Sequence, residues 1–318
     1  MGATREASRI TNPNHCSART KERLAVSDHG SPVSPEPALH TFRWVGSDHP
    51  HIDQPHVTHC GHMVIGLYGG NSRAGARKNE DGALVWCPAD GGWEFAVLLD
   101  AHFSVDSAKL VVDAVQAERD AITSMLVRPI DTAFEALHRH LLALFRSPEF
   151  RERCAQAYGE ASCLICARKS AFLWWLSVGD CVVYLLHPRL ARLGQYALNQ
   201  RSYFEWIGHD NTFDLPVPCY ASGVRRLLPG YNMVVMATDG LLECGRRPFE
   251  NPANLYEAFT RPQGGLVQAV HAVLSRVHQE RGRDSATVIA WPVGIGADYD
   301  EYEHSIGAQD PTINHEHA

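Results

Sequence analysis

Acidic side chains follow or precede several short apolar runs in this 318-residue sequence. In the clearest case, residues 95–99 have the pattern of a strand buried on both faces, and the run ends at Asp100-Ala101-His102. A carboxylate at the tip of a buried strand needs a partner or a metal, because an unpaired buried charge is costly. The other acidic residues at expected strand ends are Glu80, Asp81, Asp180, Asp239 and Asp284.

These carboxylates would repel one another if the strand ends meet, and divalent cations would remove that repulsion. Oxygen-only ligands favour Mg²⁺ or Mn²⁺ over zinc. Two such ions about 3.5–4 Å apart would generate a hydroxide nucleophile and clamp an in-line phosphoryl displacement. Taken alone, each position also has a structural interpretation: Asp100 as the cap of a helix that starts near Val105, and Asp180 as a tight-turn residue.

The composition is that of an ordinary soluble globular protein, with 45% hydrophobic and 20% charged residues. A formal net charge of −7 argues against binding to nucleic acid or to an anionic membrane. The nine cysteines are odd in number and irregularly spaced, which predicts reduced thiols in a cytoplasmic protein. The N-terminus lacks the apolar region of a signal peptide, and the longest apolar window, residues 171–186, is too short to span a bilayer.

Hydrophobic patterning divides the chain into three parts. Residues 1–40 are polar and have no hydrophobic period, which predicts a disordered arm, and residues 297–318 have the composition of an acidic tail. Between them we expect one domain over residues 41–296. The expected strands are 41–46, 63–68, 83–87, 95–99, 162–167, 171–178, 181–186, 233–237 and 286–291, and the expected helices follow residue 102 and cover 252–259 and 266–277. Strands interrupted by two blocks of amphipathic helices predict an α+β layered architecture.

Three polar segments contain residue types that bind ligands. Residues 49–62 are rich in histidine, but the spacing fits no zinc pattern and prolines interrupt it, so we expect a surface loop. Residues 70–75 resemble a Walker A loop only superficially, because Ala76-Arg77 stands where Lys-Ser/Thr is needed. The polar stretch 201–223, with interleaved aromatic residues, is typical of a surface flap near a site.

Five short motifs occur in a recognisable order over residues 62–292. They are Gly75…Asn79-Glu80-Asp81, Asp100-Ala101-His102, Gly179-Asp180-Cys181, Thr238-Asp239-Gly240-Leu241 and Asp284-Ser285-Ala286-Thr287. Their order and separations resemble those of the metal-dependent serine/threonine protein phosphatases of type 2C, the PPM family. The resemblance implies an α+β fold: a four-layer sandwich of two antiparallel β-sheets flanked by α-helices, with a metal centre at one end.

The resemblance also implies roles for the motif residues. Asp100 would bridge two Mg²⁺ or Mn²⁺ ions, and the Ala101 carbonyl would bind one of them. The remaining implied ligands are Glu80, Asp239 and Asp284 in the binuclear site, Asp81 holding a metal-bound water, and Asp180 with Asp239 at a third metal position. His102 would protonate the leaving serine or threonine oxygen, and an imidazole is a suitable general acid near neutral pH.

The chain departs from the family pattern at several positions. It has D-A-H-F-S where the family usually has D-G-H-G-G, so the turn after His102 must differ, although Ala101 still supplies a backbone carbonyl. Ala76 stands at the position of the phosphate-binding arginine, so we expect Arg77 to replace it, with Arg73 as the alternative. The family's asparagine after the last aspartate is serine here, and G-D-S-R becomes G-D-C-V. All the acidic ligands are retained.

We therefore expect a Mg²⁺- or Mn²⁺-dependent phosphomonoester hydrolase that dephosphorylates phosphoserine or phosphothreonine in proteins by direct attack of metal-activated water. The expected partner is a phosphoprotein substrate, and we expect a monomer that binds neither nucleic acid nor membrane. Two alternatives stay open. One is a catalytically silent phosphatase-like binding or regulatory module, suggested by the altered turn and the displaced arginine. The other is a phosphatase of small phosphorylated metabolites.

Overall fold

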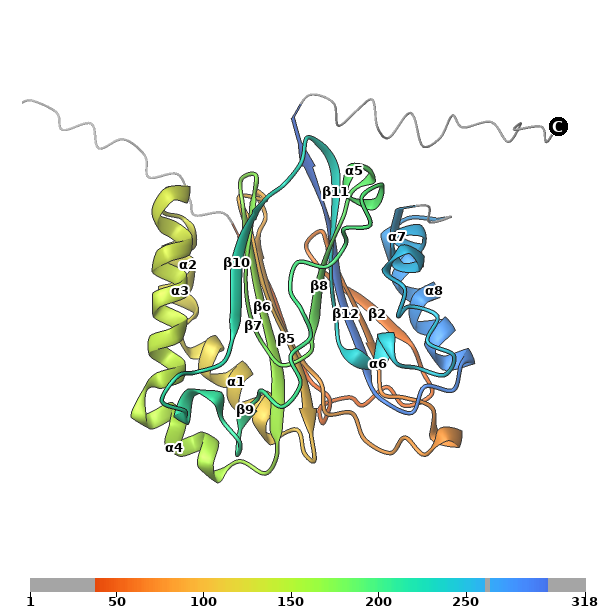
Figure 1. The fold of residues 1–318 in the computed structure, drawn as a ribbon, viewed down its shortest axis with the longest axis horizontal. Coiled ribbons are helices and arrows are strands. Elements are labelled where there is room, and N and C mark those ends of the chain that lie inside the picture. Colours follow the sequence, from red (N-terminus) through yellow and green to blue (C-terminus); the bar gives the residue numbers. More distant parts are fainter. Residues whose placement is uncertain (1–37, 261–263, 297–318) are drawn as a thin grey trace, which may run out of the picture. The chain divides into compact units, whose positions relative to one another are not determined.

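Two antiparallel β-sheets form the centre of the computed structural model, which describes residues 38–260 and 264–296 (Figure 1). Sheet A comprises β1 (Leu39–Val45), β4 (Gly82–Pro88), β5 (Trp93–His102), β6 (Glu160–Lys169), β7 (Phe172–Val178), β9 (Ile207–Gly208) and β10 (Ala221–Arg226). Sheet B comprises β2 (His56–Cys60), β3 (Met63–Tyr68), β8 (Val182–Leu186), β11 (Gly230–Ala237) and β12 (Ala286–Ile295). The strand order is β1-β4-β5-β6-β7-β10 in sheet A, with β9 beside β6, and β2-β3-β12-β11-β8 in sheet B.

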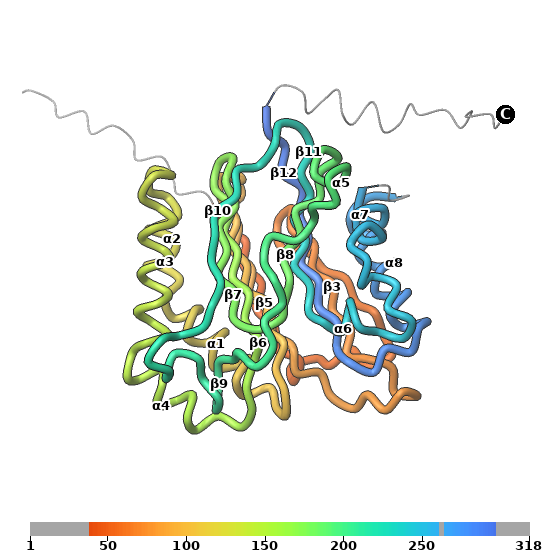
Figure 2. The backbone as a smooth tube through the Cα atoms, in the orientation of Figure 1, coloured from red at the N-terminus to blue at the C-terminus, as the bar shows by residue number. Residues whose placement is uncertain are grey.

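Helices cover the outer face of each sheet (Figures 1 and 2). Sheet A is covered by α1 (Asp106–Ala117), α2 (Arg119–Leu126), α3 (Ile130–Arg146) and α4 (Pro148–Gln156). Sheet B is covered by α7 (Pro252–Thr260) and α8 (Leu266–Gln279). The short helices are α5 (Pro188–Ala191), α6 (Asp239–Leu242), η1 (Ser72–Ala74) and η2 (Thr212–Asp214). This four-layer α+β sandwich is the expected fold class.

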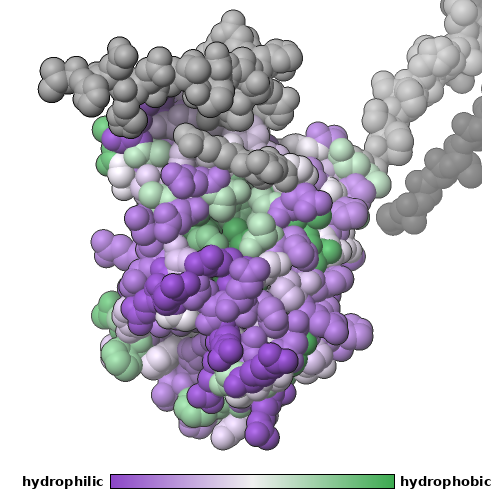
Figure 3. All heavy atoms as spheres, turned by 90° about the vertical axis from the view of Figure 1, so that its right-hand side faces the viewer, coloured by the Kyte–Doolittle hydropathy of each residue, from purple (hydrophilic) through white to green (hydrophobic). Residues whose placement is uncertain are grey.

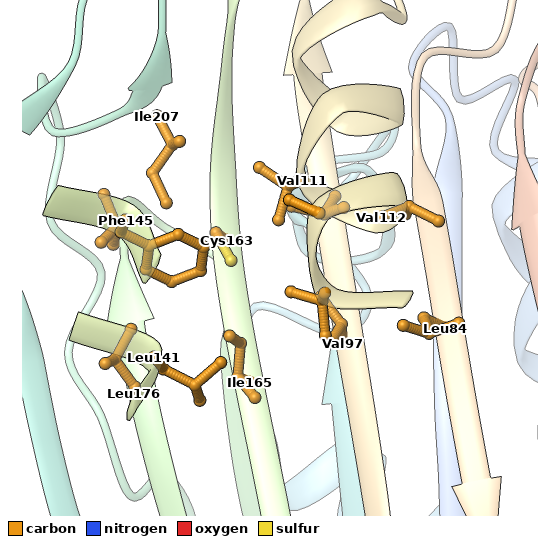
Figure 4. Close-up of a cluster of buried hydrophobic side chains, with 14 of the residues drawn as sticks. Leu84, Val97, Val111, Val112, Leu141, Phe145, Cys163, Ile165, Leu176 and Ile207 are labelled. Carbon is orange, nitrogen blue, oxygen red and sulfur yellow. The ribbon is translucent and has the colours of Figure 1, made fainter. Parts of the chain in front are cut away.

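Strand β5 shows how the layers are held together. Phe95 and Val97 belong to the core under α1–α4, part of which is shown in Figure 4. Ala96 and Leu98 belong instead to the core between the two sheets. Burial on both faces explains why this strand is a continuous apolar run and not an alternating one. A third core lies between sheet B and the helices α7 and α8. The outer face of these two helices is largely hydrophilic (Figure 3).

The histidine-rich segment differs from its expected structure. It was expected to be a surface loop, but His56–Cys60 forms strand β2 and pairs with β3. Val57 packs against the core under α8, and Cys60 is buried between the sheets. These two contacts on opposite faces stabilise a strand whose other residues are polar, so hydrophobicity alone does not reveal it.

The bounds of the expected domain stay a prediction. Residues 1–37 and 297–318 lie outside the described residues. They contain the whole expected tail and all of the expected arm except its last three residues, where β1 begins at Leu39. The expected flap, residues 201–223, contains β9, η2 and the start of β10. No helix in the described part of the chain is both long and apolar enough to cross a membrane. The described cysteines are free thiols, and of these Cys219 is exposed.

Candidate metal centre and active site

Antiparallel pairing brings the acidic residues of the motifs to one end of the sandwich. Asp100 lies near the end of β5, and Asp81 directly precedes β4, which pairs with β5. In sheet B, Asp239 follows β11 and Asp284 precedes β12, which pairs with β11. Because the end of one strand lies beside the start of its antiparallel neighbour, these positions meet. Asp180 joins them from the turn between β7 and β8.

Asp100 does not cap a helix. It lies within β5, and Val105 is the residue that precedes α1. The interpretation of Asp100 as a helix cap is therefore wrong, and the burial of its carboxylate needs another explanation.

Asp81 is fully buried and is held by hydroxyl groups of sheet B. Its Oδ2 accepts hydrogen bonds from Thr287 Oγ1 at 2.7 Å and Thr238 Oγ1 at 3.3 Å, and its Oδ1 accepts one from Ser285 Oγ at 2.8 Å. Burial raises the pKa of Asp81 to about 7, although the hydrogen bonds from Thr287 and Ser285 oppose the shift. Asp81 therefore connects the two sheets at the base of the site.

Replacement of Thr287 tests this connection. Thr287→Val keeps the shape of the side chain but removes the shorter bond to Asp81 Oδ2. We expect the free energy of unfolding to fall by about 1–3 kcal/mol, because a buried carboxylate loses a donor. Urea denaturation measures this change, and Thr41→Val, an exposed threonine in β1, is the control. Equal stability of the two variants would contradict a structural role for the Thr287 hydroxyl.

Two buried carboxylate oxygens, Asp100 Oδ2 and Asp239 Oδ1, accept no hydrogen bond from an N–H or hydroxyl group of the described residues. Burial raises the pKa of Asp100 well above its usual range, and the charges of Asp239 and Asp81 add to this effect. Burial likewise raises the pKa of Asp239 to about 6 and raises the pKa of Asp284. The carboxyl groups of Asp100 and Asp239 face each other, and a proton shared between them raises the pKa of Asp100 further and partly lowers that of Asp239. Buried carboxylates with unfilled oxygen positions provide the donor set that Mg²⁺ or Mn²⁺ requires.

The opposite end of β5 provides an internal comparison. Glu94 is also fully buried, but Arg168 binds both of its oxygens and His62 Nε2 lies 3.0 Å from its Oε1. Protein cations thus neutralise the carboxylate at that end of the strand. Asp100 has no ion pair with any described side chain, and its environment is dominated by other carboxylates. This difference fits an external cation at the Asp100 end.

Two cationic side chains hold the outer carboxylates of the site. Lys78 Nζ donates to Glu80 Oε1 and to the Phe103 carbonyl, both at 2.8 Å, and Arg201 Nη2 lies 3.5 Å from Asp239 Oδ2. In this arrangement, no three His, Cys, Asp or Glu side chains of the described residues already form a metal-binding group. The oxygen chemistry fits a divalent cation. Binding requires Glu80 to turn from Lys78, whereas Asp239 can offer Oδ1, the oxygen that does not contact Arg201.

His102 borders a pocket of about 200 Å³ beside Asp180. The pocket is also lined by Ser202, Tyr203, Phe204 and Trp206. Phe103, the next residue, has a φ of 70°, in the left-handed region that favours glycine. The D-A-H-F-S sequence thus places a left-handed phenylalanine after the histidine. Between Asp100 and His102, Ala101 is buried in β5.

The two candidate phosphate-binding arginines lie in different surroundings. Arg77 lines a pocket of about 340 Å³ together with Lys78, Glu80 and Phe103. Arg73 belongs to η1, and its charge acts on Asp53. Arg77 therefore shares a pocket with Glu80, a candidate metal ligand.

Several residues of the site were not predicted from the sequence. Lys78 and Arg201 were given no role, and Ser162, whose Oγ donates to Asp180 Oδ1 at 2.6 Å, was assigned to an ordinary strand. Thr238 and Thr287 were within the quoted motifs, but nothing in their spacing indicates that their hydroxyls meet one carboxylate. The one available signal for Arg201 was its place in the expected flap.

Comparison with solved structures identifies the fold. No family model matches the sequence, and no curated protein matches it. PppA, described as a key regulatory component of T6SS in Pseudomonas aeruginosa, aligns with a TM-score of 0.54 and 14% identity over 73% of this chain and 97% of its own. A serine-threonine phosphatase 2C from Toxoplasma gondii aligns with a TM-score of 0.53 and 13% sequence identity, over 80% of this chain and 98% of its own. A bacterial serine phosphatase bearing a point substitution aligns with a TM-score of 0.51 and 12% sequence identity, over 82% of this chain and 100% of its own.

The chain therefore has the fold of the type 2C serine/threonine phosphatases, as the order of its motifs predicts. One fold can host many functions, so at this level of sequence identity the function has to be inferred from the residues of the site.

Proposed function

We propose that this protein is a Mg²⁺- or Mn²⁺-dependent phosphatase of phosphoserine and phosphothreonine in proteins. The observation that carries the proposal is the buried carboxylate cluster at one end of a phosphatase 2C fold, in which Asp100 and Asp239 each keep an oxygen that no N–H or hydroxyl group of the described residues reaches. When bound, two such ions supply Lewis-acid stabilisation of the phosphoryl oxygens and a water that is nucleophilic near neutral pH.

The chain's own residues would hold and orient the reactants. Asp100, the Ala101 carbonyl, Glu80, Asp239 and Asp284 are the proposed ligands of the two ions. Asp81 is the proposed residue that orients the attacking water, and its three hydroxyl bonds keep its carboxylate in place.

His102 is the proposed general acid. It borders the pocket beside Asp180, where a serine or threonine leaving group has room, and it would donate a proton to the departing oxygen. Arg77 and Lys78 line the pocket that contains Glu80, and they are the proposed contacts of the phosphate oxygens. We propose a cytoplasmic monomer, which agrees with the free thiols of the described cysteines.

A substrate panel tests the proposed specificity. Phosphate release from phosphoserine and phosphothreonine peptides is compared with release from sugar and nucleotide phosphates, with Mn²⁺ and with EDTA. We expect Mn²⁺-dependent release with kcat/KM at least about tenfold higher for the peptides, because a protein substrate contacts more of the surface around His102. A preference for the small phosphates would favour the metabolite phosphatase. A folded protein that is inactive with every divalent metal would favour the silent module.

A further inference from the structure

Arg201 lies among three carboxylates at the edge of the candidate metal centre. Its Nη2 donates to Asp180 Oδ2 at 3.0 Å and lies 3.5 Å from Asp239 Oδ2, and its Nη1 lies 2.8 Å from Glu243 Oε1. The side chain of Arg201 is 21% exposed, so these interactions are partly shielded from solvent. One guanidinium thus joins the turn between β7 and β8 to both ends of α6.

The chain on either side of Arg201 is tied to the turn that carries Asp180. Asn199 Nδ2 donates to Ser177 Oγ at 2.9 Å and to the Cys181 carbonyl at 2.8 Å. The backbone N–H of Ser202 donates to the Gly179 carbonyl at 3.0 Å. The guanidinium also lies over the ring of Tyr203, 5.1 Å from its centroid. Arg201 is therefore held beside its carboxylates by the local fold, unlike a mobile surface arginine.

Asp180 and Asp239 differ in how many of their carboxylate oxygens are already engaged. Both oxygens of Asp180 are engaged, because Oδ1 accepts from Ser162 Oγ at 2.6 Å and Oδ2 accepts from Arg201. Asp239 has Oδ2 directed to Arg201, while its buried Oδ1 accepts no hydrogen bond from an N–H or hydroxyl group of the described residues. Asp239 can therefore offer an oxygen to the binuclear centre, whereas a cation at Asp180 would have to displace Arg201.

We propose that Arg201 is a built-in cation that occupies the place of a third metal ion beside Asp180 and positions Asp239 for the binuclear centre. This inference rests on the proposed function, because it requires a metal centre at Asp100 and Asp239. A guanidinium and a divalent cation cannot share the same carboxylate oxygens, since two positive charges at contact distance repel strongly. The protein would therefore bind two ions and not three.

Calorimetric titration of the full chain with Mn²⁺ tests the proposal without an activity measurement. We expect two ions for the wild type and three for Arg201→Ala, because removal of the guanidinium frees the oxygens of Asp180 and Glu243. The double variant Arg201→Ala/Asp180→Asn is expected to return to two. Arg192→Gln, at an exposed arginine in the same connection between β8 and β9, is the control and should bind two.

A second pair of variants separates charge from shape. Arg201→Gln removes the charge with a smaller change in volume and is expected to bind three ions, whereas Arg201→Lys keeps the charge and is expected to bind two. Three ions in the wild type, or two in both Arg201→Ala and Arg201→Gln, would overturn the role of Arg201 and leave the proposed metal centre intact. A folded wild type that binds no Mn²⁺ would overturn the metal centre, and the role of Arg201 with it.

Discussion

Asp239→Asn is expected to lower Mn²⁺-dependent phosphate release by on the order of 1,000-fold, because loss of a metal ligand removes several kcal/mol of transition-state stabilisation. The same substitution is expected to make the metal-free protein more stable. Burial raises the pKa of Asp239 to about 6, and the charge of Asp284 opposes its ionisation. An uncharged asparagine of similar shape removes that cost, and at pH 8 the gain is about 3 kcal/mol.

Hydrolysis of p-nitrophenyl phosphate and urea denaturation in EDTA measure these two effects. Asp120→Asn, at an exposed aspartate of α2, is the control and should change neither. Opposite changes in activity and stability would show that Asp239 serves the site at the expense of the fold. A variant that loses activity and stability together would indicate a structural role, and full activity would exclude Asp239 from the site.

The metal-free protein is expected to lose stability as the pH rises from about 4 to about 7. In the folded protein, burial raises the pKa of Asp81 to about 7 and that of Asp239 to about 6, whereas an unfolded aspartate titrates at about 3.9. Between these pH values the folded state binds more protons than the unfolded state, so the free energy of unfolding falls with rising pH. Asp239 alone accounts for about 2 kcal/mol of this loss.

Saturating Mn²⁺ is expected to reverse this dependence, because the cation binds the ionised carboxylates of the folded state. Urea denaturation at pH 5 and pH 8, in EDTA and in Mn²⁺, measures both profiles. His62 contributes in the same direction, since its hydrogen bond to Glu94 raises the pKa of His62 and that stabilisation is lost at higher pH. The His62→Gln variant therefore isolates the effect of the carboxylates. A profile that stays flat in EDTA would contradict the raised pKa values of the buried aspartates.

The sequence predicted the residues that local pattern can identify. Asp100 was recognisable because a run apolar on both faces stopped at a carboxylate, and the same pattern marked Asp239 at the end of β11. Antiparallel pairing then made the meeting of these residues a consequence of strand order. Strand β2 was missed because its stabilising contacts, through Val57 and Cys60, lie on opposite faces of an otherwise polar segment.

The cations of the site could not be predicted in the same way. Lys78 and Arg201 come from irregular segments, where no periodicity indicates the direction of a side chain. Arg201 reaches Asp180 only because Asn199 and Ser202 bind the turn between β7 and β8, which is a tertiary arrangement. The sequence therefore predicted which acidic residues meet at this end of the sandwich, but not the positive charges that balance some of them.

Anomalous X-ray diffraction from crystals of the full chain grown with Mn²⁺ tests the metal centre most directly. We expect two manganese peaks about 3.5–4 Å apart, with Asp100 in contact with both and Asp239 in contact with one. Crystals in which manganese binds elsewhere but leaves Asp100 without a metal would contradict the proposed metal centre, because the buried carboxylates would then not be metal ligands.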